Sequence, residues 1–218
     1  MTDVWNDRAQ AYRESAGHAA GADLDFLVEA CEPGEGVKVL DVATGGGHVA
    51  RRLREEGCEV VTVDASPGMR PDVVSRAEHL PFADGSFDVV VSRIAPHHFE
   101  DVRAAVAEME RVSNRLVVIE DTLFSSEPHE EAERLRDPTH VRNYTEDEWR
   151  SFFAEAGLEV EQIEPFEKTH ELEPWLARTG CAGDDAERVK ELLADRMSPD
   201  GAAWTDTKIV VKGRKSQR

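Results

Sequence analysis

The chain has 218 residues, of which 40% are hydrophobic and 33% charged, so its length and composition suit one globular domain with one core. Its 45 acidic side chains outnumber 26 basic ones and give a formal net charge of −19 at pH 7. Such an acidic surface repels phosphate groups, so we expect neither nucleic acid nor a membrane as a partner.

The cysteines and the first residues of the chain favour a cytoplasmic location. There are three cysteines, and no two of them form a CxxC pair, so neither a disulfide framework nor a zinc site is predicted. The first residues lack a basic and apolar signal segment, and no run of about 18 apolar residues occurs. We expect a cytoplasmic protein without a metal, either a monomer or a homodimer.

The N-terminal third predicts helices followed by a strand–turn–helix–strand unit. Apolar residues at helical spacing over 4–30 predict one or two amphipathic helices that end at a Pro-Gly pair. The apolar run 37–42 predicts a strand, 48–56 a helix that a glycine ends, and 59–63 a second strand. Near-continuous apolar strands around a helix are typical of a parallel sheet that is covered on both faces.

The rest of the chain continues this alternation. Prolines and glycine between 64 and 78 leave little room for a helix. The patterns predict strands at 73–74, 87–91, 115–120, 158–163 and 207–212, and helices at 101–112, 145–156, 174–178 and 184–197. The stretch 125–143 is polar and charged, and we interpret the basic residues from Lys208 to Arg218 as a solvated end.

A glycine-rich turn, VLDVATGGGHVA (39–50), joins the first strand to the next helix. Glycines at such a turn let a ligand approach the backbone, and the helix N-terminus offers free N–H groups. Asp64 ends the second strand, 19 residues after Gly45, where a carboxylate can accept both hydroxyl groups of a ribose. These residues predict a cofactor pocket, although the glycines alone could also form a plain tight turn.

Two cofactors are compatible with this turn. Gly45-x-Gly47-x-x-Ala50 matches a loose dinucleotide fingerprint, which would indicate an NAD(P)-dependent oxidoreductase. Asp41, however, lies at the mouth of the turn, where a carboxylate would repel a pyrophosphate and attract the cationic end of S-adenosyl-L-methionine. The sign of this charge favours S-adenosyl-L-methionine.

The same motifs resemble the class I S-adenosylmethionine-dependent methyltransferases, and among them the type 11 and quinone-biosynthesis methyltransferases. The resemblance covers nearly the whole chain and is carried by VLDVATGGGHVA (39–50), VDAS (63–66), AEHLPFADGSFDVVVSRIAPHHF (77–99), RDPTHVRNYTEDEWRSFFAEAGLEV (136–160) and EPWLAR (173–178). It implies an α/β fold with a Rossmann-like, doubly wound, mostly parallel seven-stranded sheet, helices on both faces and an antiparallel last strand. It also implies methyl transfer to carbon, oxygen or nitrogen of a small-molecule acceptor.

The resemblance further implies which residues bind the cofactor. The loop for the methionine end contains Asp41, Ala43, Gly45 and Gly47. Asp64 corresponds to the ribose-binding acid, and the residues beside the adenine are Ala65, Met69, Ala77 and Glu78, while Arg93 borders the methyl group. Arg76 stands where a carboxylate commonly meets the adenine, and the link from Asp64 to Glu78 is short. These departures leave open a catalytically silent module that binds S-adenosylmethionine.

The acceptor side is also implied by the resemblance. His97 and His98 follow the fourth strand and are the candidate bases, because imidazole titrates near neutrality; alternatively they simply end the strand. The candidate acceptor-binding residues are Tyr12, His18, Arg136, His140, Arg142 and Trp149. Their alternative interpretation is a surface helix, a loop of paired charges and a core tryptophan.

We therefore expect one methyltransferase domain over 1–218 with four parts. These are an N-terminal helical cover (1–33), a cofactor-binding core (37–120), a lid and helix on the substrate side (121–157), and C-terminal strands and helices (158–218).

Overall fold

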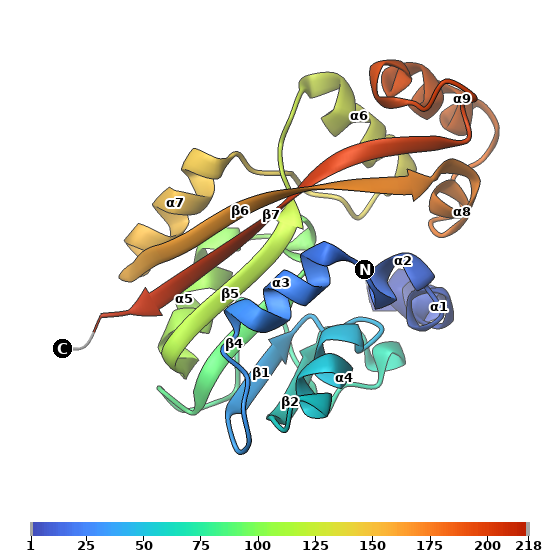
Figure 1. Ribbon diagram of the computed structural model, residues 1–218. Coiled ribbons are helices and arrows are strands. Elements are labelled where there is room, and N and C mark those ends of the chain that lie inside the picture. The colour runs from blue at the N-terminus through green and yellow to red at the C-terminus, as the bar shows by residue number, and fades with distance from the viewer. Residues whose placement is uncertain (1, 217–218) are drawn as a thin grey trace.

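In the computed structural model, which describes residues 2–216, seven strands form one sheet in the order β3-β2-β1-β4-β5-β7-β6 (Figure 1). The strands are β1 (Lys38–Val42), β2 (Glu59–Asp64), β3 (Val73–Val74), β4 (Phe87–Arg93), β5 (Ser113–Thr122), β6 (Leu158–Glu171) and β7 (Ala203–Lys215). The first five strands pair in parallel, and β7 is antiparallel to both β5 and β6. The predicted α/β fold, with its mostly parallel sheet and antiparallel last strand, is confirmed.

Helices cover both faces of the sheet (Figure 1). The helices are α1 (Thr2–Arg13), α2 (Ala16–Ala19), α3 (Ala22–Ala30), α4 (His48–Glu55), α5 (Val102–Val112), α6 (Glu127–Arg136), α7 (Glu146–Glu155), α8 (Leu172–Ala177) and α9 (Gly183–Leu192). One core cluster joins α3 and α4 to the sheet through residues such as Leu27 and Val89, and a second joins α5 and α7 to it through residues such as Met109 and Val90. The central strands are apolar on both sides because both sides are covered.

Side chains at the helix ends explain several boundaries. Asp101 caps α5 by accepting a hydrogen bond from the Ala104 N–H (3.0 Å), and Thr145 and Glu148 form a capping box at α7. Gly157 follows α7 with a φ of +81°, a conformation that glycine adopts without strain. Both helices therefore begin and end close to where the sequence predicts.

Helix α6 lies in the stretch 125–143, for which the sequence predicts no helix. It begins after Ser126, whose hydroxyl accepts the His129 N–H (3.3 Å), and it buries mostly polar side chains. Glu133 and Arg136 pair with each other (3.3 Å), and Glu130 accepts from His140 of the following loop (3.0 Å). Apolar periodicity does not predict this helix, because most of its buried residues are polar or charged.

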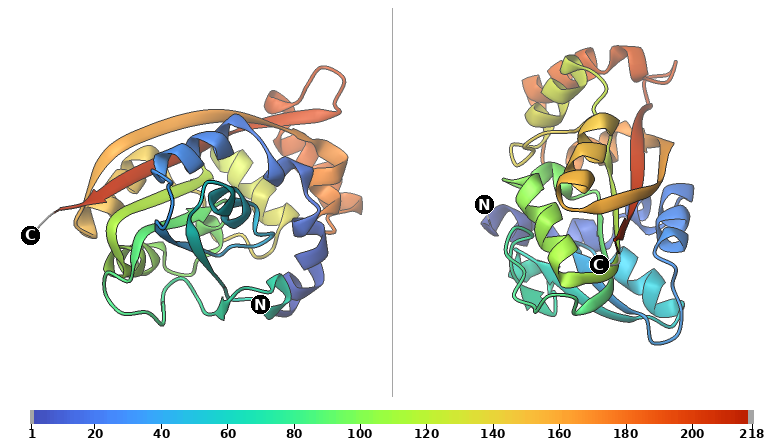
Figure 2. Two further views of the ribbon diagram at one scale, coloured as in Figure 1. Left: turned by 60° about the horizontal axis from the view of Figure 1, so that its bottom comes forward. Right: turned by 90° about the vertical axis from the view of Figure 1, so that its left-hand side faces the viewer.

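Strands β6 and β7 are much longer than the predicted 158–163 and 207–212. They pair from Leu158 with Lys215 to Glu171 with Ala203, and this ribbon curves along the molecule (Figure 2). Its far half leaves the main sheet and lies beside α6, α8 and α9 (Figure 1). These elements pack around Trp175 and Trp204. The N-terminal segment likewise forms three helices where one or two are predicted.

Candidate functional site

A cavity of about 350 Å³ lies at the carboxyl ends of β1, β2 and β4. In an open parallel sheet this edge is where ligands bind, because loops there diverge to either side. Eleven of the predicted site residues line it: Tyr12, His18, Ala43, Gly45, Asp64, Ala65, Met69, Ala77, Glu78, Arg93 and His98. The topology thus brings together segments from the first hundred residues of the chain.

The glycine-rich turn between β1 and α4 is held in left-handed conformations. Ala43, Gly45 and Gly47 have φ values of +56°, +51° and +74°. Glycine adopts such values freely, whereas Ala43 does so under strain of about 1–2 kcal/mol. A Cβ added to Gly46 would lie 2.6 Å from the Tyr12 carbonyl oxygen, so the turn packs directly under α1. Gly47 caps α4 and does not line the cavity.

Asp64, at the end of β2, has its carboxylate at the wall of the cavity. Its Oδ2 accepts the Gly45 N–H (3.0 Å) and its Oδ1 accepts the Ser66 N–H (2.9 Å). Each oxygen keeps a further lone pair, so the group can still accept two hydroxyl donors. Burial raises the pKa of Asp64, and the two backbone hydrogen bonds partly oppose this rise.

Asp41 lies behind the turn and is only 1% exposed. The Thr44 hydroxyl donates to its Oδ2 (2.6 Å), and Thr44 rather than Asp41 lines the cavity. Burial raises the pKa of Asp41 to about 7. Asp41 can therefore act on a ligand through its charge, while direct contact belongs to the turn in front of it.

The far end of the cavity has an apolar wall of Ala65, Met69 and Ala77. The link from β2 to this wall contains a 3₁₀ turn (Pro67–Met69) and the two-residue β3, with no α-helix, as the sequence predicts. Arg76 forms ion pairs with Glu78 (3.4 Å) and Glu100 (2.8 Å) at the rim. Its positive charge is therefore already neutralised at the position where the family commonly has a carboxylate.

Helix α1 closes one side of the cavity. Asn6 Oδ1 accepts from the Ser66 hydroxyl (2.8 Å) and the Gly68 N–H (2.7 Å), and Arg13 donates to the Gly68 carbonyl (2.9 Å). Tyr12 lies on the same helix and lines the cavity, and His18 follows on α2. The N-terminal segment is thus fixed over the cavity by side-chain contacts with the link after β2.

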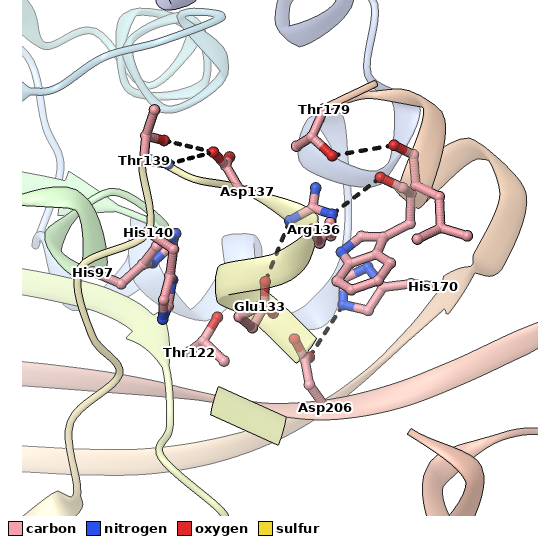
Figure 3. Close-up of polar contacts among 12 residues, drawn as sticks. His97, Thr122, Glu133, Arg136, Asp137, Thr139, His140, His170, Thr179 and Asp206 are labelled. Atoms are coloured by element: carbon pink, nitrogen blue, oxygen red, sulfur yellow. Dashed lines mark hydrogen bonds and ion pairs between the residues drawn. The ribbon is translucent and has the colours of Figure 1, made fainter. Parts of the chain in front are cut away.

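A smaller cavity of about 40 Å³, here named the side chamber, adjoins the large one. The two share Tyr12, His18, Ile94 and His98 in their walls. The rest of the side chamber is formed by Gly17, His97, Thr122, Glu133, Arg136, Lys168, His170, Trp175, Arg178 and Lys208. Figure 3 shows several of these side chains, namely His97 after β4, Thr122 of β5, Glu133 and Arg136 of α6, and His170 of β6.

His97 is a buried imidazole at the wall of the side chamber. Its Nδ1 lies 2.5 Å from Oδ1 of Asp121, a residue of β5 that the sequence analysis does not single out. Burial disfavours the protonated ring, but the Asp121 carboxylate outweighs this effect and raises the pKa of His97. Because Nδ1 faces Asp121, Nε2 is the nitrogen left for a ligand.

His98 lies between the two cavities and differs from its neighbour in charge. Its Nδ1 is 3.0 Å from the Thr139 carbonyl oxygen, so Nδ1 carries the proton and Nε2 is an acceptor. Burial, together with the nearby His97, lowers the pKa of His98 well below its ordinary value. The adjacent histidines therefore hold one neutral ring and one ring that retains a proton more readily.

Arg93 borders the large cavity, but its donors are engaged within the protein. It pairs with Asp23 (2.5 Å) and Glu120 (2.6 Å) and donates to the His18 carbonyl (3.0 Å). Burial raises the pKa of Glu120 to about 7. Arg93 therefore fixes α2 and α3 to the end of the sheet.

Three residues predicted to bind the acceptor line neither cavity, which corrects that prediction. Trp149 is fully buried, because α7 turns it into the core beside Phe152. Arg142 is exposed and pairs with Glu148 (2.7 Å). His140 is buried and bonded to Glu130, with its ring 5.3 Å from that of His97.

The side chamber also contains cations that sequence reasoning misses. Lys208 is 3% exposed, so its interpretation as part of a solvated end is wrong. It donates to Thr122 (2.7 Å) and Asp206 (2.6 Å), while Lys168 pairs with Asp23 (2.5 Å). Alternation within the strands gives no signal for them, because lysine on a strand normally faces solvent. Arg218 lies outside the described residues.

Within residues 2–216, no group of three or more histidine, cysteine or acidic side chains is arranged to hold a metal ion. Over the same residues, no helix combines the length and apolarity needed to cross a membrane.

Comparisons with known proteins agree with this geometry. Residues 40–115, from β1 into β5, match the family model described as a methyltransferase domain. The chain is similar to the uncharacterised methyltransferase YcgJ of Bacillus subtilis, with 31% identity over 85% of this chain and 82% of that protein. The crystal structure of YcgJ superposes with a TM-score of 0.80 over 90% of this chain and 99% of that one.

Two further relatives extend the pattern. The uncharacterised protein YafE of Escherichia coli is 36% identical over 68% of this chain and 73% of its own length. A demethylmenaquinone methyltransferase of Beutenbergia cavernae is 41% identical, but over only 49% of this chain and 47% of its own length. The latter match is confined to part of each chain and carries no information on the acceptor.

Proposed function

Because this chain belongs to the S-adenosylmethionine-dependent methyltransferases, we propose that it transfers the methyl group of S-adenosylmethionine to a carbon, oxygen or nitrogen atom of a small-molecule acceptor. The observation that carries the proposal is the Asp64 carboxylate at the cavity wall, oriented by the Gly45 and Ser66 N–H groups and able to accept two hydroxyl donors. The family motif around it, 40–115, supports the same assignment.

The cavity fits the donor in size and chemistry. Its volume of about 350 Å³ lies in the range of sites for small molecules and cofactors, about 300–1,000 Å³. Asp64 would hold the ribose, and Ala65, Met69 and Ala77 would contact the adenine. The turn from Ala43 to Gly47 would hold the methionine end, with the charge of Asp41 behind it. When bound, S-adenosylmethionine supplies an electrophilic methyl group.

The protein's own contribution is to align the acceptor and to exclude water. Helix α1 covers the cavity through Asn6 and Arg13. An acceptor that is a hydroxyl, a phenol or an acidic carbon must lose a proton, and His97 is the base proposed here. Asp121 holds its Nδ1, so its Nε2 can take the proton at the chamber wall. His98, which is neutral, would form the wall between donor and acceptor.

Binding of S-adenosylhomocysteine, measured by calorimetry, tests the donor assignment. We expect the wild-type protein to bind it and not NADH, since a ligand with a pyrophosphate would meet the charge of Asp41. Asp64→Asn should weaken binding about 10- to 150-fold, because charge-assisted hydrogen bonds contribute about 1.5–3 kcal/mol. Asp84→Asn, at a side chain that is 81% exposed, is the control and should change nothing. Binding of NADH, or equal affinity in both variants, would refute the proposal.

The base assignment is tested by the titration of His97, followed by NMR of the imidazole nitrogens and assigned with His97→Gln. In Asp121→Asn the pKa of His97 should fall below 6.5, because burial remains while the stabilising carboxylate is lost. If Asp121 had only a structural role, its replacement would leave the pKa of His97 unchanged. Asp84→Asn again serves as the control, and an unshifted His97 in Asp121→Asn contradicts the assignment.

A further inference from the structure

The wall of the side chamber has the opposite sign of charge from the molecule as a whole. Four cationic side chains line it, Arg136, Lys168, Arg178 and Lys208, against one carboxylate, Glu133. The whole chain carries a formal charge of −19. A surplus of positive charge around an interior space indicates an anionic occupant, because like charges brought together there repel each other.

Three of the four cations already have an anionic partner within the protein. Lys168 pairs with Asp23 (2.5 Å) and Lys208 with Asp206 (2.6 Å). Arg136 pairs with Glu133 (3.3 Å), as Figure 3 shows. It also donates to the Trp175 carbonyl (3.1 Å) and lies 4.1 Å from the centre of the Trp175 ring. These contacts hold the three cationic side chains in place, so none of the three needs a bound ligand as its partner.

Arg178, which directly follows α8, is the exception. Its backbone N–H bonds to the Pro174 carbonyl (3.2 Å), but its guanidinium forms no ion pair or hydrogen bond with any group that the structure describes, although it borders the side chamber. Burial, and then the neighbouring charge of Arg136, lower its pKa. A guanidinium has five N–H donors, and leaving them unpaired in a partly buried place is costly. The position of Arg178 is explained if an anion enters the chamber.

The size of the side chamber limits that anion. A volume of about 40 Å³ has room for a group of about three heavy atoms. A carboxylate has three heavy atoms and matches the planar fork of a guanidinium, whereas a phosphate has five. Because the chamber and the large cavity share Tyr12, Ile94 and His98, an acceptor held there by one end would extend toward the donor.

We propose that the acceptor is a carboxylic acid whose carboxylate is bound by Arg178 in the side chamber, with Arg136 contributing charge. This proposal rests on the proposed methyltransferase function, since the donor's place in the large cavity defines which side is the acceptor side. It makes Arg178 the residue that selects acidic acceptors over neutral ones of the same shape.

The test uses benzoate and its neutral counterpart benzamide as probes, titrated into the full chain at constant ionic strength with and without saturating S-adenosylhomocysteine. Benzoate should bind to the wild-type protein at least tenfold more tightly than benzamide. Arg178→Gln should lower the affinity for benzoate at least tenfold and should change the affinity for S-adenosylhomocysteine by less than twofold. Arg188→Gln removes the same charge from an exposed side chain of α9 and should alter neither affinity.

Folding of the variants is checked separately. Arg178→Gln removes a charge without a partner, so its unliganded melting temperature should equal or exceed that of the wild type. Arg178→Lys keeps the charge but loses the planar fork, and it should bind benzoate with intermediate affinity.

Three results would overturn the assignment of Arg178. They are equal binding of benzoate and benzamide, unchanged benzoate affinity in Arg178→Gln, and an equal loss of S-adenosylhomocysteine affinity, which would assign Arg178 to the donor's own carboxylate. If S-adenosylhomocysteine does not bind the wild-type protein, the donor assignment is refuted instead. The benzoate titrations without S-adenosylhomocysteine still decide the role of Arg178 in that case.

Discussion

The carboxylate of Asp41 is an acid that the fold keeps partly protonated near neutral pH. It is 1% exposed and has a pKa of about 7, above its ordinary value of 3.8, because burial disfavours the charge. The folded state therefore binds an extra proton between these two values. The stability that this proton contributes is present at low pH and is lost as the pH rises through about 7.

We predict that the affinity for S-adenosylhomocysteine rises with pH as Asp41 ionises. The cationic end of the ligand favours the charged carboxylate, so binding should release a proton. Calorimetry should show affinity about two- to tenfold higher at pH 7.5 than at pH 6, with proton release detected in buffers of different ionisation enthalpy. Asp41→Asn should bind more weakly at pH 7.5 and lose most of the pH dependence. The same slope in wild type and Asp41→Asn would assign the titration to another group.

The sequence predicts some residues of the site and misses others for a physical reason. Asp64 and Gly45 lie at the ends of consecutive elements, where strand and turn patterns locate them. Asp121 contacts His97, Lys208 contacts Thr122, and Arg178 borders a chamber whose other walls come from distant parts of the chain. Burial of a charge depends on those distant partners, which no local pattern of a single sequence contains.

Elements with an apolar core face are predictable from the sequence, whereas elements that bury polar side chains are not. The core strands and α5 follow apolar periodicity, and their predicted bounds agree closely with the structure. Helix α6 and the far half of the β6–β7 ribbon enclose polar side chains, so their patterns resemble solvated loops. These less predictable elements contribute Glu133, Arg136, Lys168 and His170 to the wall of the side chamber, where acceptor specificity would be encoded.

The junction between α7 and the ribbon gives a prediction for stability. Gly213 of β7 lies against Phe153, and a Cβ added there would be 2.5 Å from the Phe153 Cδ1 and 3.2 Å from the Leu158 Cβ. Gly213→Ala should therefore lower the free energy of unfolding by about 1–3 kcal/mol, as in an overpacked core. Urea denaturation measures this difference.

A matched substitution separates overpacking from a general effect of replacing glycine. Gly34 lacks a left-handed φ, and a Cβ there would lie 3.7 Å from a Val37 methyl group, an ordinary contact. Gly34→Ala should change the free energy of unfolding by less than about 0.5 kcal/mol. A Gly213→Ala protein as stable as Gly34→Ala would show that α7 can move away from the ribbon.

For the molecule as a whole, charge is distributed unevenly between the interior and the surface. The side chamber gathers cations, while 45 acidic residues against 26 basic ones leave the outer surface with a large negative surplus. Many exposed acids have partners, such as Glu155 with Arg103, but exposed pairs contribute only about 0–1 kcal/mol each. Repulsion among the remaining acids should therefore dominate the response to salt.

We predict that the melting temperature rises between 0.05 and 1 M NaCl, because salt shortens the Debye length from about 14 Å to about 3 Å and screens that repulsion. Scanning calorimetry in NaCl and in choline chloride should give the same rise if screening is the cause. Glu35, Glu159 and Glu164 are exposed and have no ion-pair partner among residues 2–216. Replacing all three with glutamine should raise the melting temperature at low salt and reduce its salt dependence. A melting temperature that falls with salt would instead mean that the surface ion pairs outweigh the net charge.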